Sequence, residues 1–413
     1  MPEIADFALL VLLVAGALVL AILSTRIADR LPVPAPVLFL VAAAIAASVW
    51  PQVGSALSMR TVERIAVVAL VVILLNGGLD IGWSRLRRSA GPVLSAGILG
   101  TFLTAGVVAL AAHALLGLSW TLSGIVGAAL APTDPAVVFS VLGGREIEGR
   151  SGTVLEGEAG VNDPAGIALM LGMIEVATHP DASLLVILRE FAVAMGLGVA
   201  FGLVAARALL PALRRLRLSS EELHPVLVLL LALALYGVTS LADGSGFLAV
   251  FILGLLLADA SVPYQPQIER FSASLAGLAE IVVFMALGLT IDLGSIPGQT
   301  WLDGLVLVLV LALVARPLTV LLTLTPFDLS RAELGFLAWS GLKGAVPILL
   351  AALATLGGVA GAEAVYPLVF VVVLVSVTVQ GGLVPRFAWL LGIPMRERPS
   401  TPPAARAAPG WSD

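Results

Sequence analysis

Long apolar runs, separated by short polar breaks, fill the chain from its sixth residue to about residue 392. Runs of about 17 to 25 apolar residues have the length that an α-helix needs to cross the hydrocarbon core of a bilayer. The pattern therefore predicts about thirteen membrane-spanning helices, counted here in chain order as spans one to thirteen. They cover residues 6–24, 34–50, 62–79, 90–116, 119–142, 152–177, 183–211, 222–241, 245–260, 271–290, 302–325, 334–357 and 364–392.

The composition is that of a membrane protein. Hydrophobic residues make up 59% of the 413 residues and charged residues only 12%, whereas soluble domains carry about 25% charged residues. The mean hydropathy is +1.08. The first span has no basic segment before it and no clear small-residue cleavage site, so we expect it to be retained rather than removed as a signal peptide. The predicted fold class is an all-α polytopic membrane protein.

Residue usage also excludes or disfavours several kinds of site. The chain has no cysteine, which excludes disulfides, thiol nucleophiles and cysteine metal ligands. Its three histidines, His113, His179 and His224, are isolated along the chain and do not form a metal-ligand pattern. The net charge of −5 argues against nucleic acid as a partner. We expect no cofactor.

The arginines are unevenly distributed between the loops. They cluster after the odd-numbered spans, and Arg60 is the main exception. Because cytoplasmic loops carry the excess of positive charge, the C-terminus is expected in the cytoplasm and the N-terminus outside. The expected location is the cell (inner) membrane. Residues 394–413 are rich in Pro, Ala and Arg and are predicted to form a disordered cytoplasmic tail.

Two of the predicted spans are interrupted. The fifth contains APTDPA at residues 131–136, and the twelfth contains GLKGAVP at residues 341–347. Broken helices in corresponding positions of two halves are typical of transporters built from inverted repeats. The offset of 211 residues between Thr133 and Gly344 also brings the first span onto the eighth and the fourth onto the eleventh. A displacement of seven spans is odd, so the two six-helix repeats would be inverted.

Three charged residues are predicted deep in the membrane. Asp163, in the segment GVNDPAGIAL, lies 11 residues into the sixth span, or about 16 Å at 1.5 Å per residue. The same estimate gives about 14 Å for Lys343 and about 21 Å for Arg316, measured from the ends at which their spans begin. A charge at this depth costs about 2.5 to 3.5 kcal/mol on insertion scales unless it faces water or a partner. These residues therefore mark a candidate functional site.

Helical spacing on the sixth span suggests separate roles for its polar residues. Glu158 and Asn162 are four residues apart and share one face, while Asp163 lies about 100° further round. Arg316 stays charged in practice and needs a permanent anion, for which Glu158 is the first candidate. Such a pair could also do no more than stabilise the bundle.

Asp134 and Lys343 each allow two interpretations. Asp134 can cap the half-helix that follows the first break, or it can line the site. Lys343 is the only lysine of the chain. It can compensate the partial charges of the half-helix ends, which is the interpretation we favour, or it can carry a proton.

The segments LEGEAGVNDPAG, APTDPAVV and GLKGAVPILLA resemble the signature segments of the monovalent cation/proton antiporter family. The resemblance is to its electroneutral branch, which has Asn-Asp in place of Asp-Asp, and it extends over about residues 5–392. It implies a transporter rather than an enzyme, with thirteen spans and a homodimer in the lipid bilayer. The substrates implied are a monovalent cation, K⁺ or Na⁺, and a proton.

The resemblance also implies a division of labour. Residues 1–80 and 182–292 would supply the dimerisation helices, with the connecting helix in the second range. Residues 89–178 and 301–393 would supply the ion-transport core, which moves as an elevator against the dimerisation helices.

Family roles carry over to individual residues. Asp163 would bind the cation and the proton in turn, beside Asn162. Thr133 and Asp134 would line the site, with Thr133 also a cation ligand. Glu158 and Arg316 would form a structural ion pair.

Two positions depart from the family pattern. Members often have a serine where this chain has Ala159, and many sodium-type members carry an acidic residue near Asn76. Losing hard oxygen ligands favours the larger K⁺ slightly. Two other classes of protein stay open: a cation channel or sensor, and, remotely, an intramembrane aspartyl protease using Asp134 and Asp163.

Overall fold

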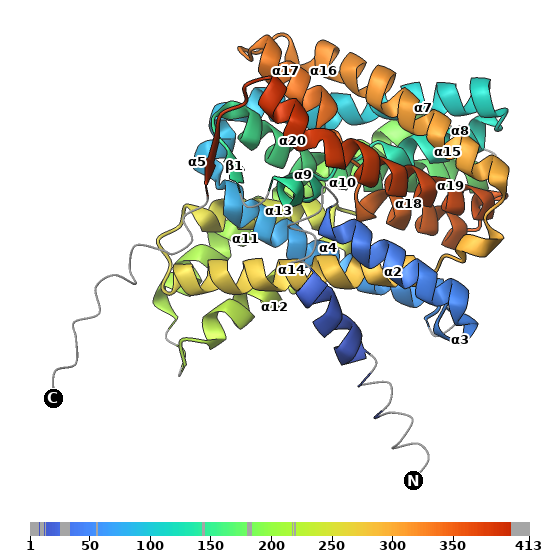
Figure 1. Ribbon diagram of the computed structural model, residues 1–413. Coiled ribbons are helices and arrows are strands. Elements are labelled where there is room, and N and C mark those ends of the chain that lie inside the picture. The colour runs from blue at the N-terminus through green and yellow to red at the C-terminus, as the bar shows by residue number, and fades with distance from the viewer. Residues whose placement is uncertain are drawn as a thin grey trace.

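The computed structural model describes residues 8, 12, 14–24, 34–54, 57–142, 145–179, 184–216, 218 and 220–397. The described chain is almost entirely helical (Figure 1). The helices are Val14–Ser24, α2 (Ala35–Val49), α3 (Pro51–Gly54), α4 (Met59–Ile81), α5 (Trp83–Leu86), α6 (Ala90–Leu94), α7 (Gly100–Leu116), α8 (Trp120–Leu130), α9 (Pro135–Val141), α10 (Arg150–Thr178), α11 (Leu184–Arg215), α12 (Leu223–Leu241), α13 (Gly246–Ala258), α14 (Gln265–Leu289), α15 (Gly298–Val310), α16 (Arg316–Leu324), α17 (Arg331–Trp339), α18 (Ala345–Leu356), α19 (Ala362–Val375) and α20 (Gly381–Leu390).

Short turns of other helical types join some of these helices. Two are 3₁₀ turns, η1 (Arg87–Ser89) and η3 (Leu293–Ser295). Three are π-helical turns within longer helices: η2 (Ser95–Leu99) before α7, η4 (Leu311–Ala315) before α16 and η5 (Ser376–Gln380) before α20. Single π-helical turns inside α-helices are frequent at functional sites.

Within the described residues, seven helices are long and apolar enough to cross a membrane. They are Met59–Ile81, Trp83–Leu116, Leu185–Arg215, Leu223–Leu241, Gln265–Leu289, Gly298–Leu324 and Ala362–Leu390. The pair α8 and α9, bent by 48° at a short break, makes an eighth if it is one span. Shorter apolar helices are Val14–Ser24, α2, α13 and α18. The all-α polytopic fold is thus confirmed, and every predicted span overlaps a helix or a broken pair of helices.

The helices form two groups (Figure 1). One group contains α2, α4 and α11–α14, in which α4 packs on both α13 and α14. The other contains α5–α10 and α15–α20, in which α7 packs on α8 and α19 packs on α15 and α18. In the view of Figure 1, α12 and α14 lie below, and α7, α8 and α15–α20 lie above. Helices α10 and α18 contact both groups.

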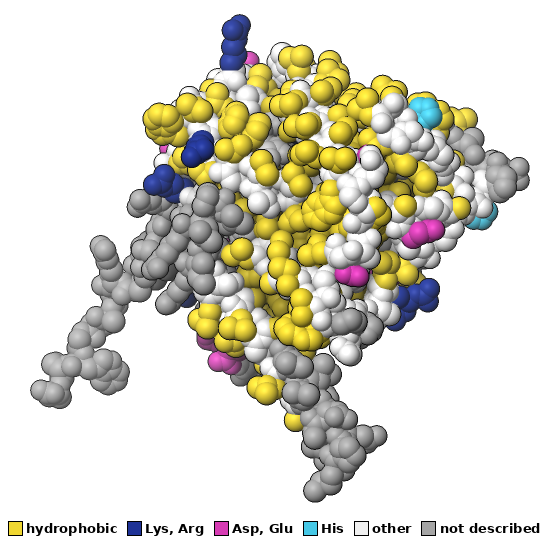
Figure 2. Space-filling view, turned by 45° about the vertical axis from the view of Figure 1, so that its right-hand side comes forward, with side chains coloured by type: hydrophobic (Ala, Val, Ile, Leu, Met, Phe, Trp, Pro, Cys, Tyr) yellow, Lys and Arg dark blue, Asp and Glu magenta, His cyan; other side chains and the backbone are white. Residues whose placement is uncertain are grey.

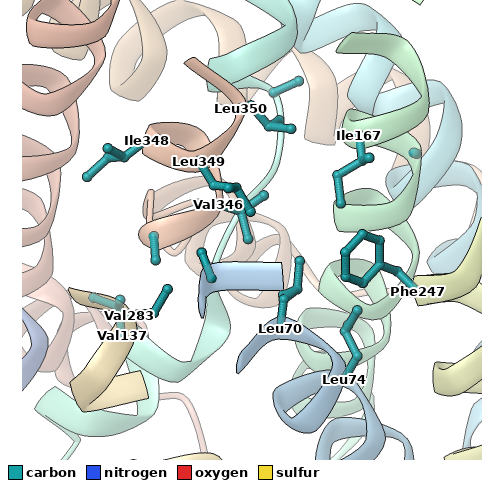
Figure 3. Packing of buried hydrophobic residues seen from close by; sticks show 14 of the residues in the cluster. Leu70, Leu74, Val137, Ile167, Phe247, Val283, Val346, Ile348, Leu349 and Leu350 are labelled. Carbon is teal, nitrogen blue, oxygen red and sulfur yellow. The ribbon is translucent and has the colours of Figure 1, made fainter. Parts of the chain in front are cut away.

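Glycines allow a close crossing of α4 and α13 in the first group. A Cβ at Gly78 of α4 would lie 2.5 Å from the carbonyl oxygen of Phe251, and one at Gly254 of α13 would lie 2.6 Å from that of Leu75. The two backbones therefore touch, as small residues permit between membrane helices. Leu70 and Leu74 of α4 and Phe247 of α13 are buried in the same part of the core (Figure 3).

Much of the outer surface of the helix bundle is apolar. Figure 2 shows a face of mostly hydrophobic side chains with few charged ones. Large side chains such as Leu185 and Val204 of α11 and Leu241 of α12 are exposed. Such a surface suits a lipid environment.

The start of the predicted disordered tail needs a correction. Residues Met395–Glu397 form strand β2, which pairs antiparallel with β1 (Arg145–Ile147). The N–H of Glu148 also donates to the carbonyl of Pro394 at 2.9 Å. Composition alone missed these backbone hydrogen bonds to a distant loop. The rest of the predicted tail lies outside the described residues.

Candidate ion site

The two interrupted helices meet at their breaks. The backbone N–H of Asp134, between α8 and α9, donates to the carbonyl of Leu342, between α17 and α18, at 2.9 Å. A Cβ on Gly344 would lie 1.8 Å from Oδ2 of Asp134, so only glycine fits there. The prolines and glycines that interrupt the helical ladder thus let the two segments approach each other.

Asp134 caps the half-helix that follows the first break, and it also lines a cavity. Its Oδ1 accepts a hydrogen bond of 2.9 Å from the N–H of Ala136, so it is the N-cap of α9. Pro135 follows at the first helical position, where its missing N–H costs nothing. The same carboxylate lines a cavity inside the molecule.

Lys343 lies at the end of the other half-helix, α8. Its Nζ donates to the carbonyls of Ala131 at 3.1 Å and Pro132 at 3.0 Å. These carbonyls follow the last turn of α8, where the backbone has no helical donor. The side chain is 2% exposed. An ammonium group against the C-terminal end of a helix also compensates its dipole.

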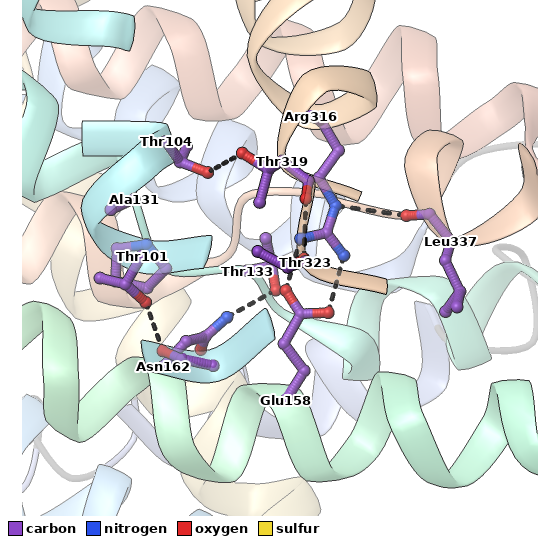
Figure 4. Close-up of polar contacts among 12 residues, drawn as sticks. Thr101, Thr104, Ala131, Thr133, Glu158, Asn162, Arg316, Thr319, Thr323 and Leu337 are labelled. Atoms are coloured by element: carbon purple, nitrogen blue, oxygen red, sulfur yellow. Dashed lines mark hydrogen bonds and ion pairs between the residues drawn. The ribbon is translucent and has the colours of Figure 1, made fainter. Parts of the chain in front are cut away.

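Arg316 joins three helices in the buried layer beside the crossing (Figure 4). It makes a bidentate pair with Glu158 of α10, in which Nη2 donates to Oε2 at 2.8 Å and Nη1 donates to Oε1. Its Nε donates to the carbonyl of Leu337 in α17 at 3.2 Å. Glu158 is 1% and Arg316 4% exposed, so each group depends on the other for compensation of its charge.

Asn162 and Thr133 form a second contact between α10 and the first break. Nδ2 of Asn162 donates to Oγ1 of Thr133 at 2.8 Å (Figure 4). Asn162 Oδ1 has no partner among the described residues. The hydroxyl of Thr133 thus lies next to Asp134 in the chain, and the amide oxygen of Asn162 lies next to Asp163.

A cavity of about 650 Å³ reaches the crossing. Its walls come from α4, α9, α10, α13, α14 and α18, and Asp163 faces it with 8% exposure. The acidic side chains that line it are Asp80, Asp134, Glu156, Asp163 and Glu280. None of the described lining residues is basic. Such a cavity attracts cations.

Of the predicted site residues, Asp134 and Asp163 line this cavity, with Asn162 and Thr133 directly beside them in the chain. Glu158, Arg316 and Lys343 belong to buried contacts outside its lining. The structure therefore separates the predicted residues into a cavity set and a buried supporting set.

The sequence reasoning missed Glu280. It lies within the predicted tenth span, and one of its carboxylate oxygens is buried without a hydrogen-bond partner among the described residues. A signal was present, because Ala273, Ala276, Gly277 and Glu280 recur at helical spacing on one face of α14. Small residues leading to an acid in an apolar span indicate a face turned to a cavity.

Broken helices that cross beside an acidic cavity, within a bundle of apolar helices, define a membrane transporter for cations. The chain belongs to the sodium/hydrogen exchanger family, because the model of that family's transmembrane region matches residues 15–390. It is thus a multi-pass membrane protein of the monovalent cation/proton antiporters, and its family consists of transporters.

Individual relatives are similar along most of the chain. The K(+)/H(+) antiporter NhaP of Alkalimonas amylolytica is 35% identical over 94% of this chain and 68% of its own length. The K(+)/H(+) antiporter NhaP2 of Shewanella sp. (strain ANA-3) is 34% identical over 93% of this chain and 67% of its own length. The solved sodium proton antiporter MjNhaP1 of Methanocaldococcus jannaschii has the same fold, with a TM-score of 0.79, 24% identity and coverage of 95% of this chain and 100% of that one.

Proposed function

We propose that this protein exchanges K⁺ for H⁺ one for one, and that Asp163 is the shared site for the two ions. The observation that carries the proposal is the cavity itself, which is lined by carboxylates and reaches Asp163 at the crossing of the broken helices. A carboxylate binds a proton or a dehydrated cation, but not both. This competition couples the two fluxes.

The neighbouring residues supply oxygen ligands. Thr133 and Asp134 belong to the first break, where unwound backbone and side chains can surround a cation. Asn162 positions the Thr133 hydroxyl through the 2.8 Å hydrogen bond. The mixture of carboxylate, hydroxyl and carbonyl oxygens suits a hard monovalent cation.

The count of charges makes the exchange electroneutral. Glu158 is held by the permanent charge of Arg316, and Asn162 does not ionise. Lys343 is engaged by two carbonyls, which keeps its charge at the half-helix end rather than in the transport cycle. We propose that, of the carboxylates that line the cavity, Asp163 alone alternates between a proton and a cation.

Thirteen spans in two inverted repeats give the simplest architecture for this cycle. The breaks lie in the fifth and twelfth predicted spans, and π-helical turns η2 and η4 lie in the fourth and eleventh. Thr104 and Thr319, which follow these turns, share a hydrogen bond of 3.1 Å. Paired irregularities in paired spans support the repeat.

Movement of the core against the other helices completes the mechanism. Residues 89–178 and 301–393 form the moving core, and 1–80 and 182–292 form the dimerisation and connecting helices of a homodimer. The cavity lies between α10 and α18 of one group and α4 and α14 of the other, which is where an elevator would open. We assign the cell membrane as its location, with the N-terminus outside and the C-terminus in the cytoplasm.

The preference for K⁺ rests on two positions and on the relatives. Ala159 offers no oxygen, and Asn76 donates to Asp80 at 2.8 Å instead of presenting a carboxylate. The relatives from Alkalimonas and Shewanella are named K(+)/H(+) antiporters. A more distant relative from Aphanothece halophytica, 28% identical, is named a Na(+)/H(+) antiporter.

Proteoliposomes that contain the purified protein and a pH-sensitive dye test the function. Adding K⁺, Na⁺ or Li⁺ in turn to an acid-loaded vesicle should move protons, with the strongest response to K⁺. Equal responses to all three cations would contradict K⁺ selection. No response to any cation, from folded protein, would contradict antiport, and single-channel currents would indicate a channel instead.

A further inference from the structure

A second cavity, of about 810 Å³, lies between the two helix groups on the other side of α10 and α13. One wall comes from α5, α6, η2 and α10, and the opposite wall from α11 and α13. Its lining is apolar over most of its length, with Ile98 and Val161 on one side and Val199, Leu203 and Leu255 on the other. We call it the lateral groove.

Two arginines are the only charged residues among the described residues that line the lateral groove. Arg207 and Arg214 are seven residues apart on α11, so they share one face about 10 Å apart along the axis. Arg207 is eight residues before the end of α11 at Arg215, or about 12 Å inside the span. Its charge is therefore close to lipid.

Neither guanidinium has a compensating partner among the described residues. Both side chains are exposed, and the described part of the chain provides no hydrogen-bond or ion-pair partner for either. An arginine on a lipid-facing helix is costly unless it reaches the interface or an anion. Two such arginines beside an apolar groove match a ligand with both an anionic group and an apolar chain. The anionic group would neutralise the arginines, and the chain would cover the apolar walls.

We propose that the lateral groove binds one anionic phospholipid. Its phosphate lies between Arg207 and Arg214, which can hold phosphate oxygens with two donors each, and an acyl chain fills the apolar length. Trp83, which lines the groove and is 45% exposed, suits the headgroup level, where tryptophan is enriched. A soluble anion would leave the apolar walls uncovered, and a second protein chain would not by itself neutralise the two charges.

The groove is adjacent to the ion cavity. Phe251 lines both spaces, and its ring packs on α10 at Gly160, where a Cβ would lie 2.1 Å from it. Val161 faces the groove, while Asp163 faces the ion cavity. A bound lipid thus touches both helix groups. If the proposed elevator movement is correct, this lipid regulates its rate, because the contacts across the groove change in each cycle.

Native mass spectrometry of the purified full chain, titrated with phosphatidylglycerol in detergent, tests the site. The wild type should retain one phosphatidylglycerol per chain in preference to phosphatidylcholine. Arg207→Gln and Arg214→Gln should each weaken that retention about fivefold, as expected for one basic residue at an anionic lipid. Arg215→Gln is the matched control, because it removes the neighbouring charge outside the groove and should change the affinity less than twofold.

A second variant keeps both arginines and fills the groove. Gly196 of α11 lines the groove, and a Cβ there would meet nothing within 4 Å, so Gly196→Phe is chosen to place a ring in the groove. It should also lower phosphatidylglycerol retention, although the charge is unchanged. Equal loss in Arg215→Gln, or undiminished retention in Gly196→Phe, would show nonspecific surface attraction and overturn the proposal. A change in oligomeric mass of the arginine variants, without loss of lipid, would assign the face to a second chain instead.

The binding result is independent of transport. Retention of phosphatidylglycerol by folded protein that exchanges no cation would refute the proposed function and leave the lipid site standing. Normal K⁺/H⁺ exchange with no selective lipid retention would refute the lipid site and leave the proposed function standing.

Discussion

The N–H of Asp134 and the carbonyl of Leu342 form a 2.9 Å hydrogen bond that joins the two interrupted helices at their breaks. The two residues are far apart in the chain, and each lies where the helical ladder is open. The bond therefore satisfies a donor and an acceptor that would otherwise be unpaired inside an apolar bundle. The bond also links the two breaks directly to each other.

Adding a methyl group at this crossing should inactivate the protein. In Gly344→Ala the new Cβ would lie 1.8 Å from Oδ2 of Asp134, which forces the two segments apart. Overpacking of this kind costs about 1 to 3 kcal/mol, and exchange in proteoliposomes should fall about tenfold or more. Gly106→Ala is the control, since a Cβ there meets nothing within 4 Å. Wild-type exchange by Gly344→Ala would contradict the close approach of the two breaks.

Glu158 and Arg316 should behave as one unit in folding. Removing either partner leaves a buried charge, which costs about 3 to 5 kcal/mol. The double variant Glu158→Ala/Arg316→Ala should lose less stability than the two single losses together. Thermal unfolding in detergent measures this cycle. Glu158→Ala combined with Glu175→Ala, at the exposed end of the same helix, should be additive, and additivity in the first pair would mean that no coupling exists.

Lys343→Met should destabilise the protein without changing the charge moved per cycle. The variant removes the donors to the carbonyls of Ala131 and Pro132. Leaving a buried acceptor unsatisfied costs about 1 to 3 kcal/mol, so the melting temperature should fall. Any residual exchange should stay electroneutral. A residual exchange that responds to voltage differently from the wild type would make Lys343 a proton carrier.

Hydrophobic periodicity predicts much of this fold, because a bilayer requires long apolar helices with internally satisfied backbones. The boundaries are less predictable. The fourth predicted span starts at residue 90, but its helix continues back to Trp83 through Arg85, Arg87 and Arg88. Basic side chains can extend a helix beyond the apolar core, since their charged ends reach the interface. Hydropathy alone does not detect that extension.

The polar residues of the site are predictable where a charge interrupts an apolar run. Asp163, Arg316 and Lys343 stand out in this way. The pairing of Asp134 with Leu342 and the packing of Gly344 on Asp134 are tertiary contacts, which no local pattern encodes. Asp80 lines the cavity because its face of α4 is turned towards it. That orientation depends on packing between helices.

Exchange should be insensitive to membrane potential. Only Asp163 is proposed to change its charge, and it trades one proton for one cation. A net charge moved per cycle would couple the equilibrium to voltage by about 2.3 kcal/mol per 100 mV. Proteoliposomes with a potential set by an ionophore for an ion that is not transported measure this. A proton gradient that shifts with the imposed voltage at zero net flux would rule out a one-for-one exchange.

Asp163→Asn should abolish exchange in folded protein, because an amide neither titrates nor neutralises a cation. Glu175→Gln, which changes a half-exposed acid near the end of the same helix, should exchange like the wild type. Size-exclusion profiles and melting temperatures establish that both variants are folded. Undiminished exchange by Asp163→Asn would remove this residue from the ion site.

Proton release on cation binding tests the shared site most directly. Purified protein in weakly buffered detergent solution, below the pH at which Asp163 loses its proton, receives K⁺ while a dye records the pH. A single site shared by the two ions predicts the release of close to one proton per chain, saturating with K⁺ and absent in Asp163→Asn. Saturable K⁺ binding without proton release, or the same release from Asp163→Asn, would contradict competition at Asp163.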